Sequence, residues 1–124
     1  MLYRLLLICL LLSSCAANRM VETDLYFGMS KPDGGSVTDK EWESFRENYI
    51  VTAFKQGSTI INASGSWLDP VSRKQVTEAS HLVIYLHKKS KAVSKQIDSL
   101  RKQYQTQFQQ QSVLRVDKKV TVAF

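Results

Sequence analysis

A continuous apolar stripe with the spacing of an α-helix runs through the last third of the sequence. Val93, Ile97, Leu100, Tyr104 and Phe108 stand at positions i, i+4, i+7, i+11 and i+15, which places all five side chains on one helical face. The glutamine-rich stretch around the last two forms the solvent-facing side and the end of this helix. A helix with one apolar face has to cover another apolar layer, so the rest of the chain must supply one.

An earlier segment predicts a second helix. The tetrapeptide Thr38–Glu41 has the pattern of a capping box, in which the threonine side chain and the glutamate side chain each bind the other residue's backbone N–H. Trp42, Phe45 and Tyr49 follow at helical spacing. We therefore expect a helix from residue 38 or 39 to about Ile50, with Trp42 packed in the core.

Strand-like patterns occupy much of the remaining chain. Residues 24–30, 59–68 and 75–87 are rich in apolar and β-branched residues and are bounded by glycine and proline turns. The centre of the third segment, residues 82–86, is apolar on both faces, which favours a central strand. The closing segment after residue 112 is either one strand or two short strands separated by a bend at residues 117–119.

The resulting order is strand, helix, strand, strand, helix, strand. This order predicts an α+β fold of the ferredoxin-like βαββαβ type, a sandwich in which an antiparallel sheet carries both helices on one face. We assign Leu82, Ile84 and Leu86 to the helix side. The open face is then expected to carry Tyr26, His81, Val83, Tyr85 and His87. Such a face is more apolar than water prefers, so a second copy, another protein or a small ligand is expected to cover it.

The first fifteen residues have the layout of a secretory signal peptide. Arg4 gives a positive start, Leu5–Leu12 is an unbroken apolar run, and the small residues Ser13 and Ser14 precede Cys15. Eight helical residues cover only about 12 Å, which is too short for a hydrocarbon core of about 30 Å. We therefore expect residues 1–14 to be cleaved off.

The segment Leu12–Cys15 also resembles the bacterial lipobox. Cleavage before Cys15 discards Cys9 and leaves a single cysteine in the mature chain, which lipidation would protect from intermolecular pairing. The resemblance implies that Cys15 carries a lipid anchor, and that Ala16 in the next position directs the protein to the outer membrane, facing the periplasm. The expected organisation is a signal peptide (1–14), a lipidated tether (15–21) and one α+β domain (22–124).

The mature sequence shows no catalytic or cofactor motif. It lacks a nucleophile elbow, a P-loop and a dinucleotide fingerprint. His81 and His87, the only histidines, would lie about 20 Å apart on one strand. We therefore expect no metal and no cofactor.

Positive charge gathers in one segment of a chain whose formal net charge is +6. The cluster comprises Lys88, Lys89, Lys91 and Lys95. We interpret it as a solvated face or as a surface attracted to anionic lipid, at about 1 kcal/mol per lysine. No nucleic-acid recognition motif accompanies it, so nucleic acid is not expected as a partner.

Short segments along the mature chain resemble a family of small bacterial secreted and lipid-anchored proteins, catalogued as domain of unknown function 3574. They are Leu25–Gly28, Pro32–Gly35, Glu41–Trp42, Gly65–Trp67, Glu78–Ser80 and Gln111–Val116. The chain departs from the family at Thr52–Ala53, where Pro-Arg is usual, and at Ser66, where Gln is usual. The family has no established activity, so the resemblance implies a cellular address and a fold but no mechanism.

The sequence leaves two functions open. The first is a non-enzymatic binding module, anchored in the bacterial cell envelope through Cys15, with the membrane and either a second copy or another envelope protein as partners. The second is a small enzyme or small-molecule binder with a pocket on the open sheet face, completed by a dimer. Its candidate residues are Tyr26, Trp67, Glu78, His81, Tyr85 and Arg115. A deep pocket joining Trp67, Glu78 and Arg115 would favour the second function, and a flat open sheet the first.

Overall fold

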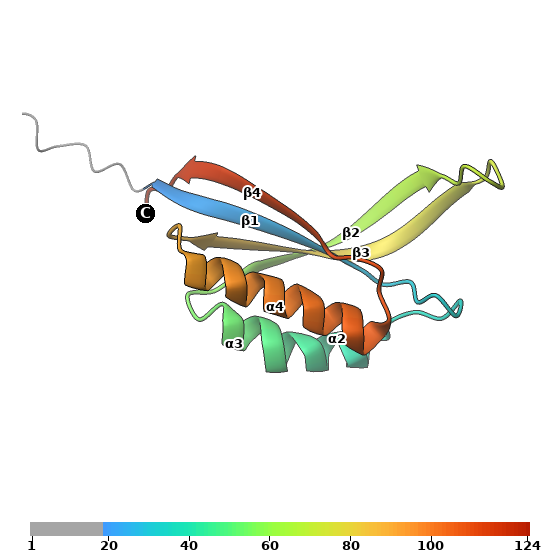
Figure 1. Ribbon diagram of the computed structural model, residues 1–124, viewed down its shortest axis with the longest axis horizontal. Coiled ribbons are helices and arrows are strands. Elements are labelled where there is room, and N and C mark those ends of the chain that lie inside the picture. The colour runs from blue at the N-terminus through green and yellow to red at the C-terminus, as the bar shows by residue number, and fades with distance from the viewer. Residues whose placement is uncertain (1–18) are drawn as a thin grey trace, which may run out of the picture.

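The computed structural model describes residues 19–124 and has the expected ferredoxin-like arrangement (Figure 1). Four strands form one antiparallel sheet in the order β2-β3-β1-β4, and the helices cover one of its faces. The strands are β1 (Arg19–Gly28), β2 (Thr59–Leu68), β3 (Gln75–His87) and β4 (Leu114–Thr121). The predicted signal peptide and the predicted lipidation site, Cys15, lie outside the described residues.

The first helical segment begins where the capping box predicts. The backbone N–H of Glu41 donates to Thr38 Oγ1 at 3.2 Å, and the backbone N–H of Thr38 donates to Glu41 Oε2 at 2.8 Å. The segment consists of α2 (Asp39–Phe45), the π-helical turn η2 (Arg46–Ile50) and α3 (Val51–Ala53). It therefore continues past the predicted end.

The π-helical turn decides which side chain enters the core. Phe45 and Ile50 are both 0% exposed and stand five residues apart, which is the spacing of a π turn. Tyr49 stands at the α-helical spacing expected from the sequence, yet it is 37% exposed. A purely α-helical pattern predicts Tyr49 as the buried residue, so the extra residue in this turn explains the difference.

Helix α4 (Lys91–Phe108) buries the predicted apolar stripe against the sheet. Phe27 of β1 lies at the centre of an aromatic core, with its ring centroid 4.8 Å from that of Tyr104 and 5.5 Å from that of Trp42. Edge-to-face and tilted contacts of this kind stabilise a core beyond the area that they bury. Neither α4 nor any other helix within residues 19–124 combines the length and apolar character needed to cross a membrane.

The predicted faces of β3 are reversed. Val83, Tyr85 and His87 are buried and face the helices, together with His81. The residues that share the open face with Tyr26 are Leu82, Ile84 and Leu86. The position of Tyr26 on the open face was predicted correctly.

Aromatic partners from the first helical segment fix the orientation of β3. The ring of His81 stacks on Trp42 with centroids 4.1 Å apart, and the ring of Tyr85 stacks on Phe54 at 4.0 Å. Because β3 is apolar on both faces, its periodicity cannot show which face lies inside. Stacking on Trp42 and Phe54 therefore determines which face of β3 is buried.

The outer strand boundaries also differ from the sequence prediction. Strand β1 begins at Arg19, which pairs with Thr121, so residues 19–21 belong to the sheet and not to the tether. Backbone hydrogen bonding to β4 adds these residues to the sheet. Strand β4 is a single strand whose pairing with β1 continues through Asp117, and of the two alternatives for the closing segment the single strand is correct.

Candidate functional site

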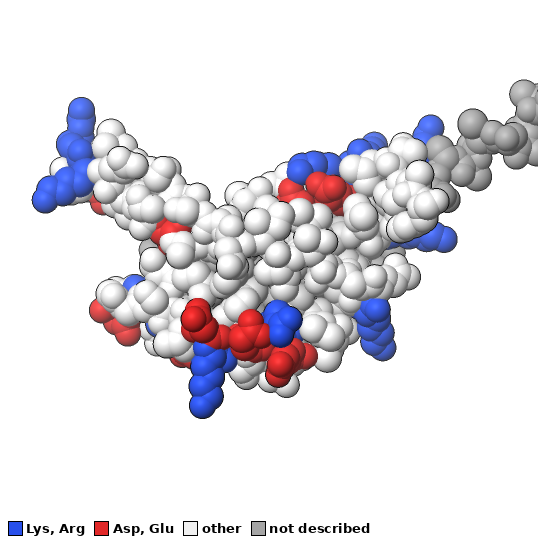
Figure 2. Space-filling view, turned by 180° about the vertical axis from the view of Figure 1, so that it is seen from behind, with Lys and Arg blue, Asp and Glu red and all other residues white. Residues whose placement is uncertain are grey.

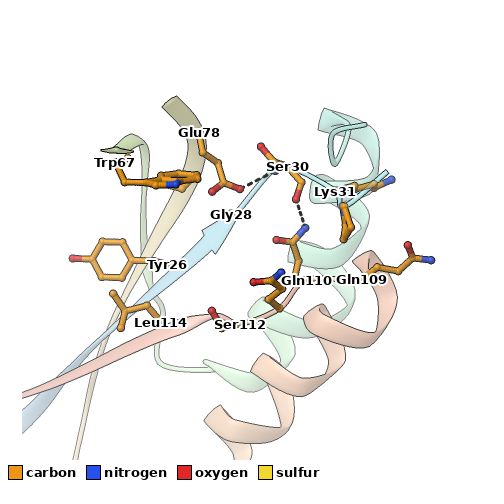
Figure 3. A pocket seen from close by; sticks show the side chains of 14 residues that line it. Tyr26, Gly28, Ser30, Lys31, Trp67, Glu78, Gln109, Gln110, Ser112 and Leu114 are labelled. Carbon is orange, nitrogen blue, oxygen red and sulfur yellow. Dashed lines mark hydrogen bonds between the residues drawn. The ribbon is translucent and has the colours of Figure 1, made fainter. Parts of the chain in front are cut away.

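A hollow of about 500 Å³ opens on the uncovered face of the sheet, where β1 runs into the following turn (Figure 3). All four strands contribute to it, together with the turn after β1 and the segment between α4 and β4. Its walls include Tyr26, Gly28, Ser30, Gly65, Trp67, Glu78, Gln110, Ser112 and Leu114. Its volume lies in the range of small-molecule sites, about 300–1,000 Å³.

Two aromatic side chains and a leucine form the apolar part of the hollow. Tyr26 pairs with Leu114 of β4, so the two side chains stand next to each other on the same face. Trp67 projects from β2 on that face and is 47% exposed, which is unusual for so large an apolar ring. These rings offer a flat surface for stacking.

A carboxylate is fixed beside Trp67, on the side of the hollow that faces the turn after β1. Glu78 Oε1 accepts a hydrogen bond from the backbone N–H of Ser30 at 3.0 Å, and the side chain of Gln110 donates to the Ser30 carbonyl at 2.6 Å (Figure 3). Both backbone groups of Ser30 are therefore held by side chains. Glu78 Oε2 accepts no hydrogen bond from any residue within 19–124, so it is available to a ligand.

Two glycines shape the space around this carboxylate. A Cβ atom at Gly28 would lie only 2.7 Å from Glu78 Oε1, so the carboxylate can approach this closely because the residue is glycine. The carbonyl of Gly28 is held from the other side by the hydroxyl of Tyr104 at 2.8 Å, and burial raises the pKa of that hydroxyl. Gly65 pairs directly with Glu78, and a Cβ there would meet no atom within 4 Å. Its missing side chain keeps the floor of the hollow open.

Two other predicted site residues lie on the opposite face of the sheet. Tyr85 is buried between Phe54 and His87. His81 stacks on Trp42, and its Nδ1 lies 2.9 Å from Asn62 Oδ1. Partial burial lowers the pKa of His81 against the opposing influence of nearby carboxylates. Both residues therefore act in packing and do not reach the hollow.

The last predicted site residue, Arg115, also lies on the helix face. Its guanidinium contacts Asp98 at 3.0 Å, Asp117 at 3.0 Å and the side chain of Ser94 at 3.1 Å. Partial burial opposes the charge of Arg115, but Asp117 and Asp98 raise its pKa overall. Arg115 lines a separate hollow of about 660 Å³ at the start of α4. The structure thus joins Trp67 and Glu78 in one hollow but excludes Arg115 from it.

Sequence reasoning missed the residues that position Glu78. Ser30 and Gln110 have no motif, and Gln110 belongs to a glutamine-rich stretch that was expected to be a solvated helix face. The one available signal was Gly28, because a glycine inside a strand often marks the close approach of another group. No group of three potential metal-ligating side chains occurs in the described part of the chain.

Solved structures with the same fold include two of a phage SAM lyase. The complex with S-methyl-5'-thioadenosine is 17% identical and has a TM-score of 0.57, with 83% of this chain and 90% of that chain covered. The apo form is 13% identical with a TM-score of 0.59, with 90% and 96% covered. CutA from Synechococcus elongatus is 12% identical with a TM-score of 0.52, with 89% and 85% covered.

At this level of identity the likeness shows the fold alone. No curated protein matches the chain. The family model described as "Protein of unknown function (DUF3574)" matches residues 22–124, and the six segments that suggested the resemblance lie inside this range. They supply Tyr26, Gly28, Trp67 and Glu78 to the hollow. The match extends over most of the chain, which therefore belongs to the family of domain of unknown function 3574.

Proposed function

We propose that this protein is anchored by lipid in the bacterial cell envelope and binds a small ligand in the hollow of its open sheet face. The lipobox pattern at Cys15 supports the anchor. One arrangement supports ligand binding: the aromatic surface of Trp67 and Tyr26 stands beside the free carboxylate oxygen of Glu78, with open space over Gly65.

The chemistry of the hollow defines a ligand class. A flat apolar group can stack on Trp67 or Tyr26, and a positive charge can contact both the ring faces and the Glu78 carboxylate. Lys31, the basic residue at the rim, is engaged by Glu41 at 2.9 Å, so it does not compete for Glu78. We therefore expect a small ligand that carries a flat ring and a positive charge.

Two compounds serve as first probes. S-adenosylmethionine combines a flat adenine ring with a positively charged sulfonium group. S-methyl-5'-thioadenosine, found in the complex of the phage SAM lyase, has the same ring but no such charge. Comparing the two separates the contribution of stacking from that of the Glu78 carboxylate.

Tryptophan fluorescence measures binding directly. The chain has two tryptophans, of which Trp42 is 3% exposed and Trp67 is 47% exposed. In a Trp42→Phe background the signal comes from Trp67 alone. We expect both probes to quench this signal with saturation, and Glu78→Gln to weaken binding of S-adenosylmethionine more than that of S-methyl-5'-thioadenosine.

A matched pair of variants tests the position of the site. Gly65→Val adds a branched side chain where a Cβ meets nothing within 4 Å, so it fills the hollow without a clash. Ser66→Val adds a branched side chain of the same size one residue further, on the other face of the strand and outside the hollow. We expect the first variant to abolish quenching and the second to leave it intact. Equal behaviour of the two variants would place the binding elsewhere.

A catalytic role is the alternative, and the free oxygen of Glu78 is the observation that favours it. A fixed carboxylate with one unengaged oxygen can accept a proton from a bound substrate. Incubation with S-adenosylmethionine followed by chromatography distinguishes the two functions. Turnover that Glu78→Gln abolishes would establish an enzyme, whereas saturable binding without any product supports a binding module.

The anchor has a separate test. Labelling with a radioactive fatty acid in a bacterial host should mark the wild-type protein and leave Cys15→Ser unlabelled. Label retained by Cys15→Ser would exclude lipidation at this position, whatever the binding experiments show.

A further inference from the structure

The hairpin of β2 and β3 extends beyond the four-stranded sheet. Pairing between β1 and β3 ends at Gly28 and Ser80, but pairing between β2 and β3 continues to Leu68 and Gln75. We call the hairpin from residue 64 to residue 79 the arm. Figure 1 shows it bending away from the helices. Two strands alone are only marginally stable in water, so an arm of this length requires additional contacts.

The arm carries apolar side chains that the rest of the chain does not cover. Trp67 is 47% exposed, Leu68 is 59% exposed and Val71 at the tip is 91% exposed. The arm ends in Arg73 and Lys74, which keep the tip soluble. Its exposed apolar residues are therefore available to another molecule.

The open face of the sheet continues the side of the arm that carries Trp67, whereas Leu68 lies on the other side. The pairing register places Leu114, Tyr26, Leu82 and Ile61 side by side in one row across all four strands. Leu114 is 57% exposed and Ile61 is 45% exposed. An antiparallel sheet with one solvated face normally alternates apolar and polar residues, whereas here this row of the solvated face is apolar as well.

The area of this face approaches what a stable dimer needs. Four strands about 4.8 Å apart and about ten residues long give a face of roughly 600 Å². A stable interface of standard size buries roughly 600–1,000 Å² on each partner. The open face, with the strands of the arm included, therefore lies at the lower end of this range.

The charges on the open face are compatible with a second copy of this chain as the occupant. Lys118 contacts Asp24 at 2.6 Å and Glu22 at 3.1 Å, so this cluster is largely paired within one chain and keeps one excess negative charge. The surface between the arm and the body is nearly free of charge in Figure 2. The weak negative charge of each face is small beside the apolar row through Tyr26 and Leu82, so it does not prevent two identical faces from meeting.

The shape of the face also favours self-association. Both ends of the sheet rise away from the helices, and the surface between arm and body is hollowed (Figures 1 and 2). A twisted sheet is concave along one diagonal and convex along the other. Two such surfaces therefore fit when their strands cross at a steep angle, as in orthogonal sheet packing.

We propose that two copies of this protein pack through their open sheet faces, with the arm of each copy lying on the sheet of the other. The partner then closes the outer side of the hollow formed by Tyr26, Trp67 and Glu78. This closure rests on the proposed function, whereas the dimer itself does not.

The experiment uses the mature chain from residue 15 with Cys15→Ser, so that no disulfide can join two copies. Sedimentation velocity and light scattering should show a dimer in the micromolar range. Ile61→Lys places a charge on the open face, on the edge strand β2 and outside the hollow, and should weaken the dimer at least tenfold. Val51→Lys, at a 57% exposed apolar residue of α3, is the matched control and should leave the dimer intact.

Four results would overturn the dimer: a monomer at every concentration up to about 100 µM, an assembly of more than two copies, a dimer that Ile61→Lys does not weaken, or equal dissociation by Val51→Lys. The closure of the hollow has its own readout. Monomeric Ile61→Lys should bind the probes more weakly than the dimer does. Unchanged binding would contradict the closure but not the proposed function, which the Gly65→Val and Ser66→Val pair tests independently.

Discussion

The Nε2 atom of His87 lies 2.9 Å from the hydroxyl oxygen of Thr23, and both side chains are buried. The same hydroxyl donates its only proton to Asp117 Oδ1 at 2.6 Å, so His87 must donate to Thr23. His87 Nδ1 lies 2.9 Å from the carbonyl oxygen of Lys88 and has to donate as well. His87, Thr23 and Asp117 thus form a buried chain of side-chain hydrogen bonds that joins β3, β1 and β4.

Thr23 is therefore the link between a buried imidazole ring and the carboxylate of Asp117. Burial opposes ionisation of Asp117, but hydrogen bonds from Thr23 and Arg115 lower its pKa overall. We expect Thr23→Val to cost about 2 kcal/mol of unfolding free energy, because His87 and Asp117 each lose a partner. Urea denaturation measures this loss. Thr77→Val, the same change at an exposed position of β3, should alter stability very little, and an equal effect of both would contradict this role.

The capping box gives the protein a defined acid sensitivity. The backbone N–H of Thr38, and then Lys31, lower the pKa of Glu41 from 4.5 to about 2. The folded chain thus favours the ionised form, so this contribution to stability is complete above pH 4.5 and disappears as the pH falls toward 2. Glu41→Gln cannot ionise and should lose less stability than the wild type between neutral pH and about pH 3.

Chemical denaturation at several pH values tests this prediction. Glu47→Gln is the control, because Glu47 is also on the first helical segment but its side chain is 70% exposed and makes only a 4.0 Å contact with Arg46. We expect Glu47→Gln to follow the wild-type curve. If the unfolding free energy of Glu41→Gln fell as steeply with decreasing pH as that of the wild type, the capping carboxylate would not be the cause of the acid sensitivity in this pH range.

Local sequence signals predicted the elements of this fold where short-range chemistry decides them. The Thr38–Glu41 capping box set the start of α2, and the helical stripe ending at Phe108 set α4. The turns at residues 31–35 and 69–74 bounded the strands. The capping box, the helical stripe and the turns each depend on residues only a few positions apart, so a short stretch of sequence is enough to predict them.

Long-range packing decided the features that were predicted wrongly. The faces of β3 depend on the stacking of Tyr85 on Phe54, which lies in another element. The same reversal removed His81 and Tyr85 from the candidate site. Tyr26, Trp67 and Glu78 lie in one hollow because the register pairs β1 with β3 and β3 with β2. No local pattern encodes that register, and none identifies Gln110 as a wall of the hollow.

The glycine at residue 28 is expected to control the position of the Glu78 carboxylate. In Gly28→Ala the new Cβ would lie 2.7 Å from Glu78 Oε1, so the carboxylate has to leave the backbone N–H of Ser30. We expect faster hydrogen exchange of the Ser30 amide and a stability loss of about 1 kcal/mol. Gly65→Ala is the control, because its Cβ meets nothing within 4 Å. Unchanged exchange in Gly28→Ala would show that the carboxylate does not depend on this glycine.

The basic end of the molecule is expected to contact anionic lipid when Cys15 is anchored. Arg19 begins β1 and lines one hollow with Lys89 and Lys119, and Lys88 directly follows the end of β3. Arg19 is the fourth residue after Cys15, so the two Cα atoms lie at most about 14 Å apart. The anchor thus brings this end within reach of the lipid headgroups, where each lysine contributes about 1 kcal/mol.

Vesicle binding by the mature chain with Cys15→Ser isolates this electrostatic contribution from the lipid anchor. Lys88→Glu combined with Lys89→Glu should weaken binding to phosphatidylglycerol vesicles at least tenfold, at about 1 kcal/mol for each lysine. Arg73→Glu combined with Lys74→Glu makes the same change in charge at the tip of the arm, at the opposite end of the molecule (Figure 2). Because only one end faces the membrane, this control should bind nearly as well as the wild type. Equal weakening by both pairs would mean that binding follows net charge alone.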